Sequence, residues 1–113
     1  MSASSDLIQR QLDAYNAQDI DAFMACYTDD AILAGLNGAV TQTGREAIRT
    51  RHMDLFAEHP QNRAELVNRI DLGSAVVDHE KVERFPGGEP FEVAAIYTIR
   101  DGKIARVDFA RGS

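Results

Sequence analysis

Apolar residues recur at helical spacing near the start of the chain. Ile8, Leu12 and Tyr15 fall at i, i+4 and i+7, so they share one face of a helix predicted over residues 5–18. Asp19 follows, and its residue type commonly caps a helix at its first turn. A second, shorter helix is therefore expected directly after it, and the two helices should form a hairpin.

A third helix is predicted over residues 44–58. Thr43 and Glu46 have the spacing of a capping box, which marks the start of a helix. The residues that share its apolar face are Ile48, His52, Leu55 and Phe56. His52 stands out among them because it is the one polar residue on that face.

From residue 62 onward the pattern changes to extended runs rich in β-branched residues. Strands are predicted over residues 63–72, 75–85, 91–100 and 103–111, after two earlier extended segments over 27–36 and 39–42. Asp101-Gly102 predicts a tight hairpin turn, because both of its central residues need positive φ. Short breaks favour an antiparallel meander, and helices separate from such a sheet indicate a two-layer α+β fold.

The strand over residues 91–99 is apolar on both faces. Alternation points Phe91, Val93, Ala95, Tyr97 and Ile99 to one side, and Ala94 and Ile96 to the other. The helices can cover only one side of the sheet. We therefore expect a homodimer that covers the outer sheet face.

Composition and charge narrow the class of protein. The chain of 113 residues suits one domain over 1–113, and its net charge of −6 argues against nucleic-acid binding, which needs a basic surface. Cys26, the single cysteine, fits a small core residue and a reducing compartment. No signal peptide and no stretch of about 20 apolar residues is visible, so a cytoplasmic protein without membrane contact is expected.

Four motifs follow one another along the chain. They are Tyr15-Asn16-Ala17-Gln18-Asp19-Ile20-Asp21-Ala22, Tyr27-Thr28-Asp29-Asp30-Ala31, Gly44-Arg45-Glu46-Ala47-Ile48-Arg49 and Asp101-Gly102-Lys103-Ile104. Together they resemble the nuclear transport factor 2-like superfamily, and within it the SnoaL-like and ketosteroid-isomerase-like proteins. The resemblance implies a cystatin-like cone, in which a curved antiparallel sheet wraps around three N-terminal helices and encloses a ligand pocket. Its members include enzymes and noncatalytic domains, so the fold alone does not define the function.

The resemblance also allows the catalytic positions of ketosteroid isomerases to be compared. Those enzymes use an aspartate base and an oxyanion hole made of a tyrosine and a protonated aspartate. By pattern, the tyrosine falls on Gln11, the base near Gly35 and the protonated aspartate on Ala95. Gly35 and Ala95 cannot transfer protons, which argues against steroid isomerisation.

Two histidines are the candidate catalytic residues. His52 is expected to reach a space left where the last four strands curl over the third helix, and to face Gln11 there as an acid or base. The alternative is a buried histidine bonded to a backbone carbonyl or to Gln11. His79 would join His52 if its face of the strand were the concave one, a choice that Asp78 and Glu80 on the opposite face leave open. Further pocket candidates are Tyr15, Phe23, Tyr27, Arg51, Phe56, Ala95 and Tyr97.

These residues favour a protein that binds or converts a small hydrophobic molecule by acid/base chemistry. A noncatalytic ligand-binding or dimerisation module is the alternative, and a partner-protein adaptor is a third possibility. No glycine-rich phosphate loop and no dinucleotide fingerprint is present, so no cofactor is expected. Three histidines spread over the chain do not make a metal motif, so no metal site is expected either.

Overall fold

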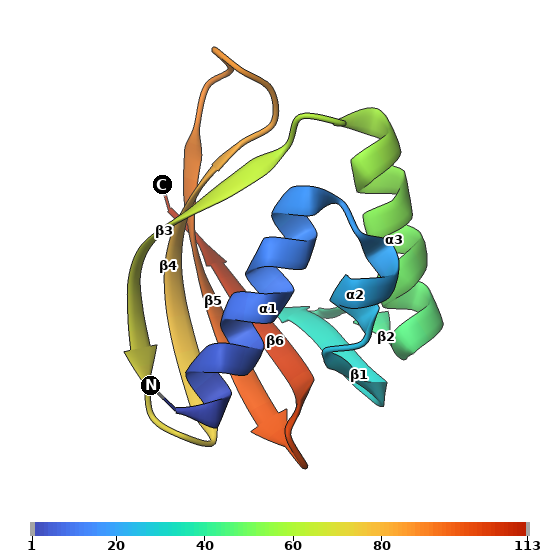
Figure 1. Ribbon diagram of the computed structural model, residues 1–113, viewed down its shortest axis with the longest axis vertical. Helices are drawn as coiled ribbons and strands as arrows, with labels where there is room; N and C mark the ends of the chain where they lie inside the picture. The colour runs from blue at the N-terminus through green and yellow to red at the C-terminus, as the bar shows by residue number, and fades with distance from the viewer. Residues whose placement is uncertain (1, 113) are drawn as a thin grey trace.

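The computed structural model describes residues 2–112, which form three helices and one six-stranded sheet (Figure 1). In chain order the elements are α1 (Ala3–Ala17), α2 (Ile20–Met24), β1 (Tyr27–Gly35), β2 (Val40–Thr43), α3 (Arg45–Glu58), β3 (Arg63–Asp71), β4 (Ala75–Glu83), β5 (Phe91–Arg100) and β6 (Lys103–Arg111). Each predicted helix and strand is present, with bounds close to those expected. The α+β fold class is confirmed.

The strands lie in the order β2-β1-β6-β5-β4-β3. The predicted meander from β3 to β6 is antiparallel throughout. One pair departs from the antiparallel arrangement, because β1 runs parallel to β6. These two strands are far apart in the sequence, so no short turn forces them to run in opposite directions.

The turn between β5 and β6 has the backbone that its sequence predicts. Asp101 has φ of 53° and Gly102 has φ of 75°, both in the left-handed region. This is the conformation of the two central residues in a tight hairpin turn with the right-handed twist of its strands.

The start of α3 differs from the prediction, while the start of α2 agrees with it. The Asp19 side chain accepts a hydrogen bond from the Ala22 amide at 3.1 Å and caps α2. The predicted capping box of α3 is wrong, since its N-cap is Gly44, with φ of 90° and no side-chain cap. Thr43 is still paired with Ile32 in the sheet, and the positive φ that follows suits glycine rather than a β-branched residue.

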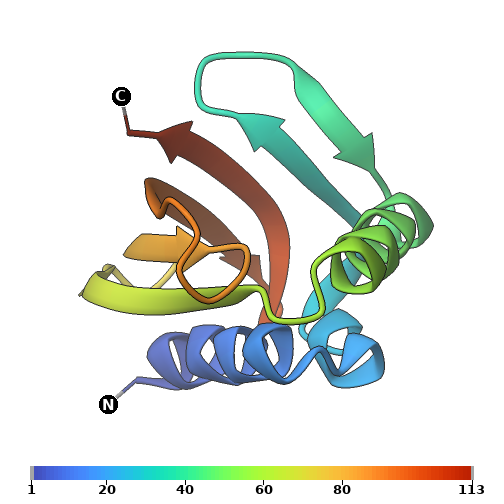
Figure 2. The ribbon, with the colours of Figure 1, turned by 90° about the horizontal axis from the view of Figure 1, so that it is seen from above.

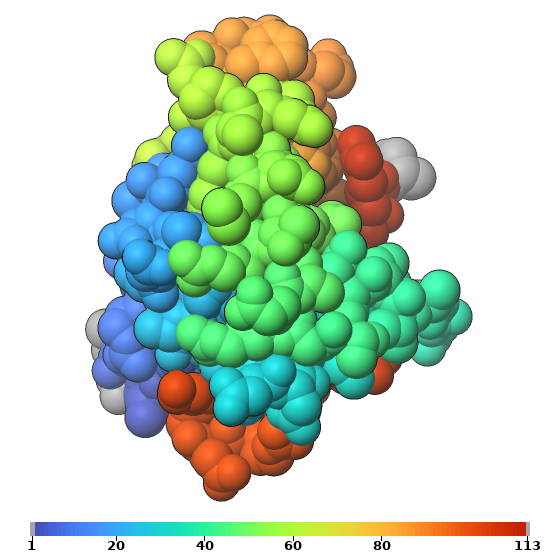
Figure 3. Space-filling model, turned by 90° about the vertical axis from the view of Figure 1, so that its right-hand side faces the viewer, coloured from blue at the N-terminus to red at the C-terminus, as the bar shows by residue number. Residues whose placement is uncertain are grey.

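The helices cover the concave side of the sheet in two places. Helix α1 packs on β3 and β4, α3 packs beside β1 and β2, and α2 bridges the two longer helices (Figures 1 and 2). The last four strands were expected to curl over the third helix, and this expectation is wrong. The helix that packs on β3 and β4 is α1. Figure 3 shows α3 running the height of one face of the molecule, beside the hairpin of β1 and β2.

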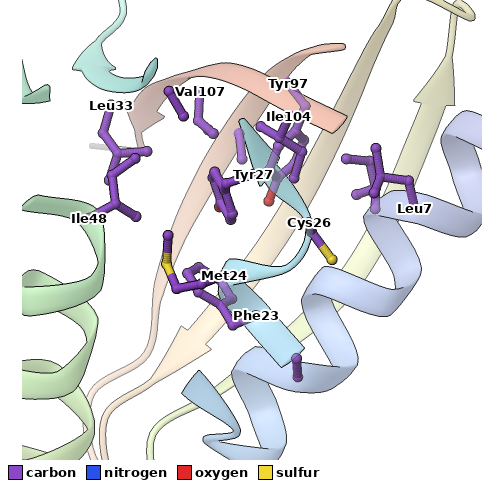
Figure 4. Close-up of a cluster of buried hydrophobic side chains, with 14 of the residues drawn as sticks. Leu7, Phe23, Met24, Cys26, Tyr27, Leu33, Ile48, Tyr97, Ile104 and Val107 are labelled. Atoms are coloured by element: carbon purple, nitrogen blue, oxygen red, sulfur yellow. The ribbon is translucent and has the colours of Figure 1, made fainter. Parts of the chain in front are cut away.

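The main hydrophobic core brings together side chains from α1, α2, α3 and the inner strands (Figure 4). Phe23 has no exposed surface, and its ring centroid lies 5.1 Å from that of Tyr27 and 4.5 Å from that of His52. Cys26 is buried at the edge of this core, as predicted. Tyr97 and Tyr27 belong to this core and also border the cavity described below.

The outer face of the sheet carries the partly apolar surface expected from the sequence. Ala95 and Tyr97 on β5 are buried under the helices, while Ala94 and Ile96 point outward and are partly exposed. Val77 lies beside Ile96 on the same face. A homodimer through this face stays a prediction. Within residues 2–112, no helix has the length and apolar character needed to cross a membrane.

Candidate functional site

The concave side of the sheet, α1 and α3 enclose a cavity of about 290 Å³. Its apolar wall consists of Leu12, Ala34, Leu55, Val82, Phe91, Val93 and Phe109. Its polar wall consists of Gln11, Tyr15, Tyr27, Thr41, Arg51, His52, Glu80, Arg84, Tyr97 and Arg111. A mostly apolar space with a few convergent polar groups is typical of a small-molecule site, and this one suits a small ligand.

Most of the residues expected in a pocket border this cavity, but not all. Those on the wall are Gln11, Tyr15, Tyr27, Arg51, His52 and Tyr97. Phe23, Phe56 and Ala95 do not line it, contrary to expectation, because they are buried in the packing behind the wall. The Phe56 ring, for example, lies edge-on against Tyr15 with centroids 5.8 Å apart.

His52 is a neutral hydrogen-bond acceptor on the cavity wall. Its Nδ1 lies 2.8 Å from the carbonyl oxygen of Ile48, one helical turn earlier. A carbonyl can only accept, so Nδ1 carries the proton and Nε2 keeps a lone pair. Burial lowers the pKa of His52 to about 4. The backbone-bonded histidine weighed as the alternative is therefore what the structure contains, and a catalytic role for His52 stays a prediction.

His79 lies outside the cavity. Its side chain is 44% exposed, and its Nε2 lies 2.6 Å from Glu92 Oε1 on the outer sheet face. The pairing of His79 with His52 depended on His79 lying on the concave face of its strand, and this condition is not met. Along β4 the even-numbered residues, from Val76 to Val82, are the buried ones. Valine occurs twice among the even-numbered residues of β4 and once among the odd-numbered ones. This difference was the signal in the sequence for which face turns inward.

Gln11 joins two tyrosines at the deep end of the cavity. Its Nε2 donates to the Tyr27 hydroxyl, and its Oε1 accepts from the Tyr97 hydroxyl, both at 3.3 Å. Burial raises the pKa of both phenols, so both stay protonated. The Gln11 amide accepts a hydrogen bond from one tyrosine hydroxyl and donates one to the other, and this holds for both orientations of the amide. The hydroxyl that accepts from Gln11 therefore keeps its own hydrogen, which has no acceptor among these three side chains. That hydrogen is available to a ligand oxygen.

Glu80 is a polar residue of the cavity wall that the sequence analysis did not select. It is 7% exposed, borders the cavity, and its Oε2 is buried without a hydrogen-bond partner among the described residues. Burial raises the pKa of Glu80 to about 7, and the neighbouring Asp78 carboxylate adds to the rise. The chain thus places a carboxyl group that gains and loses its proton near neutral pH on the wall of an apolar cavity.

Three arginines give the cavity wall positive charge. Arg51 and Arg111 are exposed, and Arg84 is half-buried. Only Arg51 was selected from the sequence. The alternation that points Val107 and Phe109 inward also points to Arg111, and this was the signal available for it. Within residues 2–112, no group of three or more His, Cys, Asp or Glu side chains could hold a metal ion.

The α+β cone and its enclosed cavity define a class of protein that the comparisons identify. A family model described as a SnoaL-like domain matches residues 8–107. The chain therefore belongs to the SnoaL-like family, and the resemblance inferred from its motifs is confirmed. Among curated proteins, none matches the chain in sequence.

Solved structures support this assignment. The chain is similar to an uncharacterised cystatin fold protein from Novosphingobium aromaticivorans, with 36% identity, a TM-score of 0.90, and 98% of this chain and 99% of that chain covered. A "putative polyketide cyclase" from Sinorhizobium meliloti has 26% identity, a TM-score of 0.79, and coverage of 97% and 100%. A "putative ketosteroid isomerase" from Kribbella flavida has 16% identity, a TM-score of 0.84, and coverage of 98% and 78%, which shows a shared fold alone.

Proposed function

We propose that the cavity binds a small hydrophobic molecule and that Glu80 transfers protons on it without a cofactor. The observation that carries the proposal is the position of Glu80, a buried carboxyl on the cavity wall whose pKa is raised to about 7. A general acid or base works best when its pKa lies near the working pH. Perturbed carboxyl groups in clefts are candidates for such chemistry.

The proposed substrate carries a carbonyl group. The spare phenolic O–H of the Gln11, Tyr27 and Tyr97 group donates to the carbonyl oxygen. The Glu80 carboxylate takes a proton from the adjacent carbon, the C–H electron pair forms the enolate, and the phenol stabilises the negative oxygen. The protonated Glu80 then returns its proton to carbon. The name of the similar Sinorhizobium meliloti protein, a putative polyketide cyclase, refers to a keto compound, which supports this choice.

Proton exchange on a simple ketone tests the proposal directly. Acetophenone in D₂O with the protein should lose its methyl proton NMR signal faster than in matched buffer. Glu80→Gln should slow the protein-dependent exchange by about 100-fold or more, since general acid/base groups contribute about 10²–10⁴-fold. Glu83→Gln is the matched control, because Glu83 lies on the same strand but does not line the cavity. Exchange no faster than in buffer, or unaffected by Glu80→Gln, would contradict proton transfer by this residue.

Noncatalytic ligand binding is the second candidate function. It is favoured by the absence of an acidic side chain at Gly35 and Ala95, the positions that match the isomerase's catalytic aspartates, and by the neutral state of His52. In the same experiment, this function predicts that acetophenone shifts the amide NMR signals of cavity residues saturably while its own proton signal does not decay.

A further inference from the structure

Three arginines on the cavity wall have no carboxylate partner within residues 2–112. Among the described residues, the arginines within salt-bridge distance of a carboxylate are Arg49 with Asp21, Arg69 with Asp78, Arg100 with Asp30 and Arg106 with Asp108. Arg51, Arg84 and Arg111 are in none of them, although the chain has a net charge of −6. Positive charge is thus left unmatched at a cavity in an otherwise acidic protein.

Arg84 is held in place by neutral groups. Its Nη1 donates to Asn62 Oδ1 at 2.8 Å. Asn62 is 3% exposed, and its Nδ2 donates to the Tyr15 hydroxyl at 2.7 Å. A guanidinium has five N–H donors, and this chain of contacts orients it without neutralising it. A carboxylate in the place of Asn62 would have formed an ion pair, so the arrangement keeps the charge of Arg84 available.

Phe91 brings a second arginine close to the first. The guanidinium carbon of Arg111 lies 4.0 Å from the centroid of the Phe91 ring, and that of Arg84 lies 4.9 Å from it. Cation–π contacts stabilise each arginine, but the two like charges repel one another. A ligand carboxylate that contacts both arginines would offset that repulsion and make charge-assisted hydrogen bonds.

Acidic residues lie near the mouth but do not pair with these arginines. Glu46, Asp54 and Glu58 on α3 line a shallow groove that Arg51 and Arg84 also border. None of their carboxylates is within the 4.0 Å of an ion pair with either arginine. Arg111 does not border this groove, but it lines the cavity, where its guanidinium group lies over the Phe91 ring.

We infer that the ligand of this cavity is a small carboxylate, with its anionic end bound by Arg84 and Arg111 beside Phe91. The inference deepens the proposed function, because it concerns the same cavity. The cations lie at the exposed mouth, and the uncharged donors of Tyr27 and Tyr97 lie at the buried end. Glu80 lines the same cavity, four residues before Arg84 and so about 13 Å away along an extended chain. The side chains of Arg84 and Glu80 reach into the cavity and shorten this distance. A ligand made of a phenyl ring and a short acidic substituent is then long enough to bridge it.

Cinnamate and cinnamamide are a matched pair of probes, because they share one shape and differ in charge. NMR titrations at low salt should give a dissociation constant at least 10-fold lower for cinnamate than for cinnamamide. Arg84→Gln should reduce this preference by about 10-fold, because it weakens cinnamate binding more than cinnamamide binding. Arg63→Gln is the control, because Arg63 is exposed on β3, away from the cavity, and its loss changes the net charge by the same amount.

Arg111→Gln provides a second test that does not disturb Asn62, and it should also reduce the preference for cinnamate. Equal dissociation constants for the two probes, or equal effects of Arg84→Gln and Arg63→Gln, would overturn the inference. If ketone exchange nevertheless depends on Glu80, the proposed function survives that result. If the protein prefers cinnamate to cinnamamide but does not exchange the protons of acetophenone, only the proposed proton transfer is contradicted. If neither cinnamate nor cinnamamide binds, both the inference and the proposed function are contradicted.

Discussion

Asp78 and Glu80 point to the same buried face of β4, yet only Asp78 is paired with a cation. Arg69 donates from Nε and Nη2 to the two carboxylate oxygens of Asp78, at 2.7 Å and 2.9 Å. The Glu80 Oε2 atom has no hydrogen-bond partner among the described residues. The Asp78 carboxylate in turn helps to raise the pKa of Glu80.

Glu80 should make the protein less stable as the pH rises. Its pKa is about 7 in the folded chain and 4.5 by reference, so the folded state holds the proton over a range in which the unfolded state has lost it. This difference costs about 3 kcal/mol of unfolding free energy between those two pH values. Glu80→Gln should therefore be more stable than the wild type at pH near 8 and similar to it at pH near 4. Urea denaturation at fixed pH measures this, and Glu83→Gln should follow the wild type at both pH values.

His52 should have the opposite effect on the acid side. Its pKa is about 4 in the folded chain against 6.5 by reference, so the unfolded state binds more protons in that range. The free energy of unfolding should fall by about 3 kcal/mol as the pH drops from 6.5 to about 4. His52→Gln should lack this fall, and His59→Gln, which changes a histidine outside the cavity, should retain it. Identical acid-side curves for the wild type and His52→Gln would show that His52 is not held neutral by burial.

Loss of Arg69 should destabilise the fold strongly. Asp78 has no exposed side-chain surface, so Arg69→Met leaves an uncompensated buried charge that costs about 3–5 kcal/mol. The double variant Arg69→Met with Asp78→Leu should recover most of this loss, because it removes the charge as well as its partner. Thermal and urea unfolding measure both variants, with Arg63→Met as the exposed control. A double variant as unstable as the single one would contradict the electrostatic explanation.

The outer sheet face should mediate a homodimer, as the sequence pattern suggests and as we propose. Ile96, Val77 and Ala94 form a partly apolar centre, flanked by the His79–Glu92 and Arg106–Asp108 pairs. Ile96→Glu places a charge opposite Asp108 and should convert a dimer into a monomer in sedimentation velocity. Met53→Glu, on the exposed side of α3, should leave the oligomeric state unchanged. A wild-type monomer at high concentration would rule out the dimer.

Local patterns in the sequence were enough to predict the elements. Helical spacing placed Ile48 and His52 on the buried face of α3, and Asp101-Gly102 marked the turn between β5 and β6. Both signals act over a few residues. The parallel pairing of β1 with β6 depends instead on contacts between distant segments, and no short-range pattern specifies it.

The candidate site was predicted only in part, for a related reason. His52 was found because a polar residue on an apolar helix face is conspicuous, and Gln11 was found because the resemblance to ketosteroid isomerases places their oxyanion tyrosine at this position. Glu80 alternates with His79 on a strand where both faces mix charged and apolar residues, so its direction depended on the whole sheet. Arg84 follows the end of β4, and its orientation comes from Asn62, a residue more than twenty positions earlier.

The position of β6 between β1 and β5 has a consequence for how the chain is made. This strand comes last in sequence but joins the two halves of the sheet, so neither half has its inner neighbour until β6 has been synthesised. Until that moment both β1 and β5 present open backbone edges to any other extended chain nearby. Nascent copies of the protein are therefore exposed to mispairing on the ribosome, and a stop codon before β6 should yield aggregates rather than a smaller folded product.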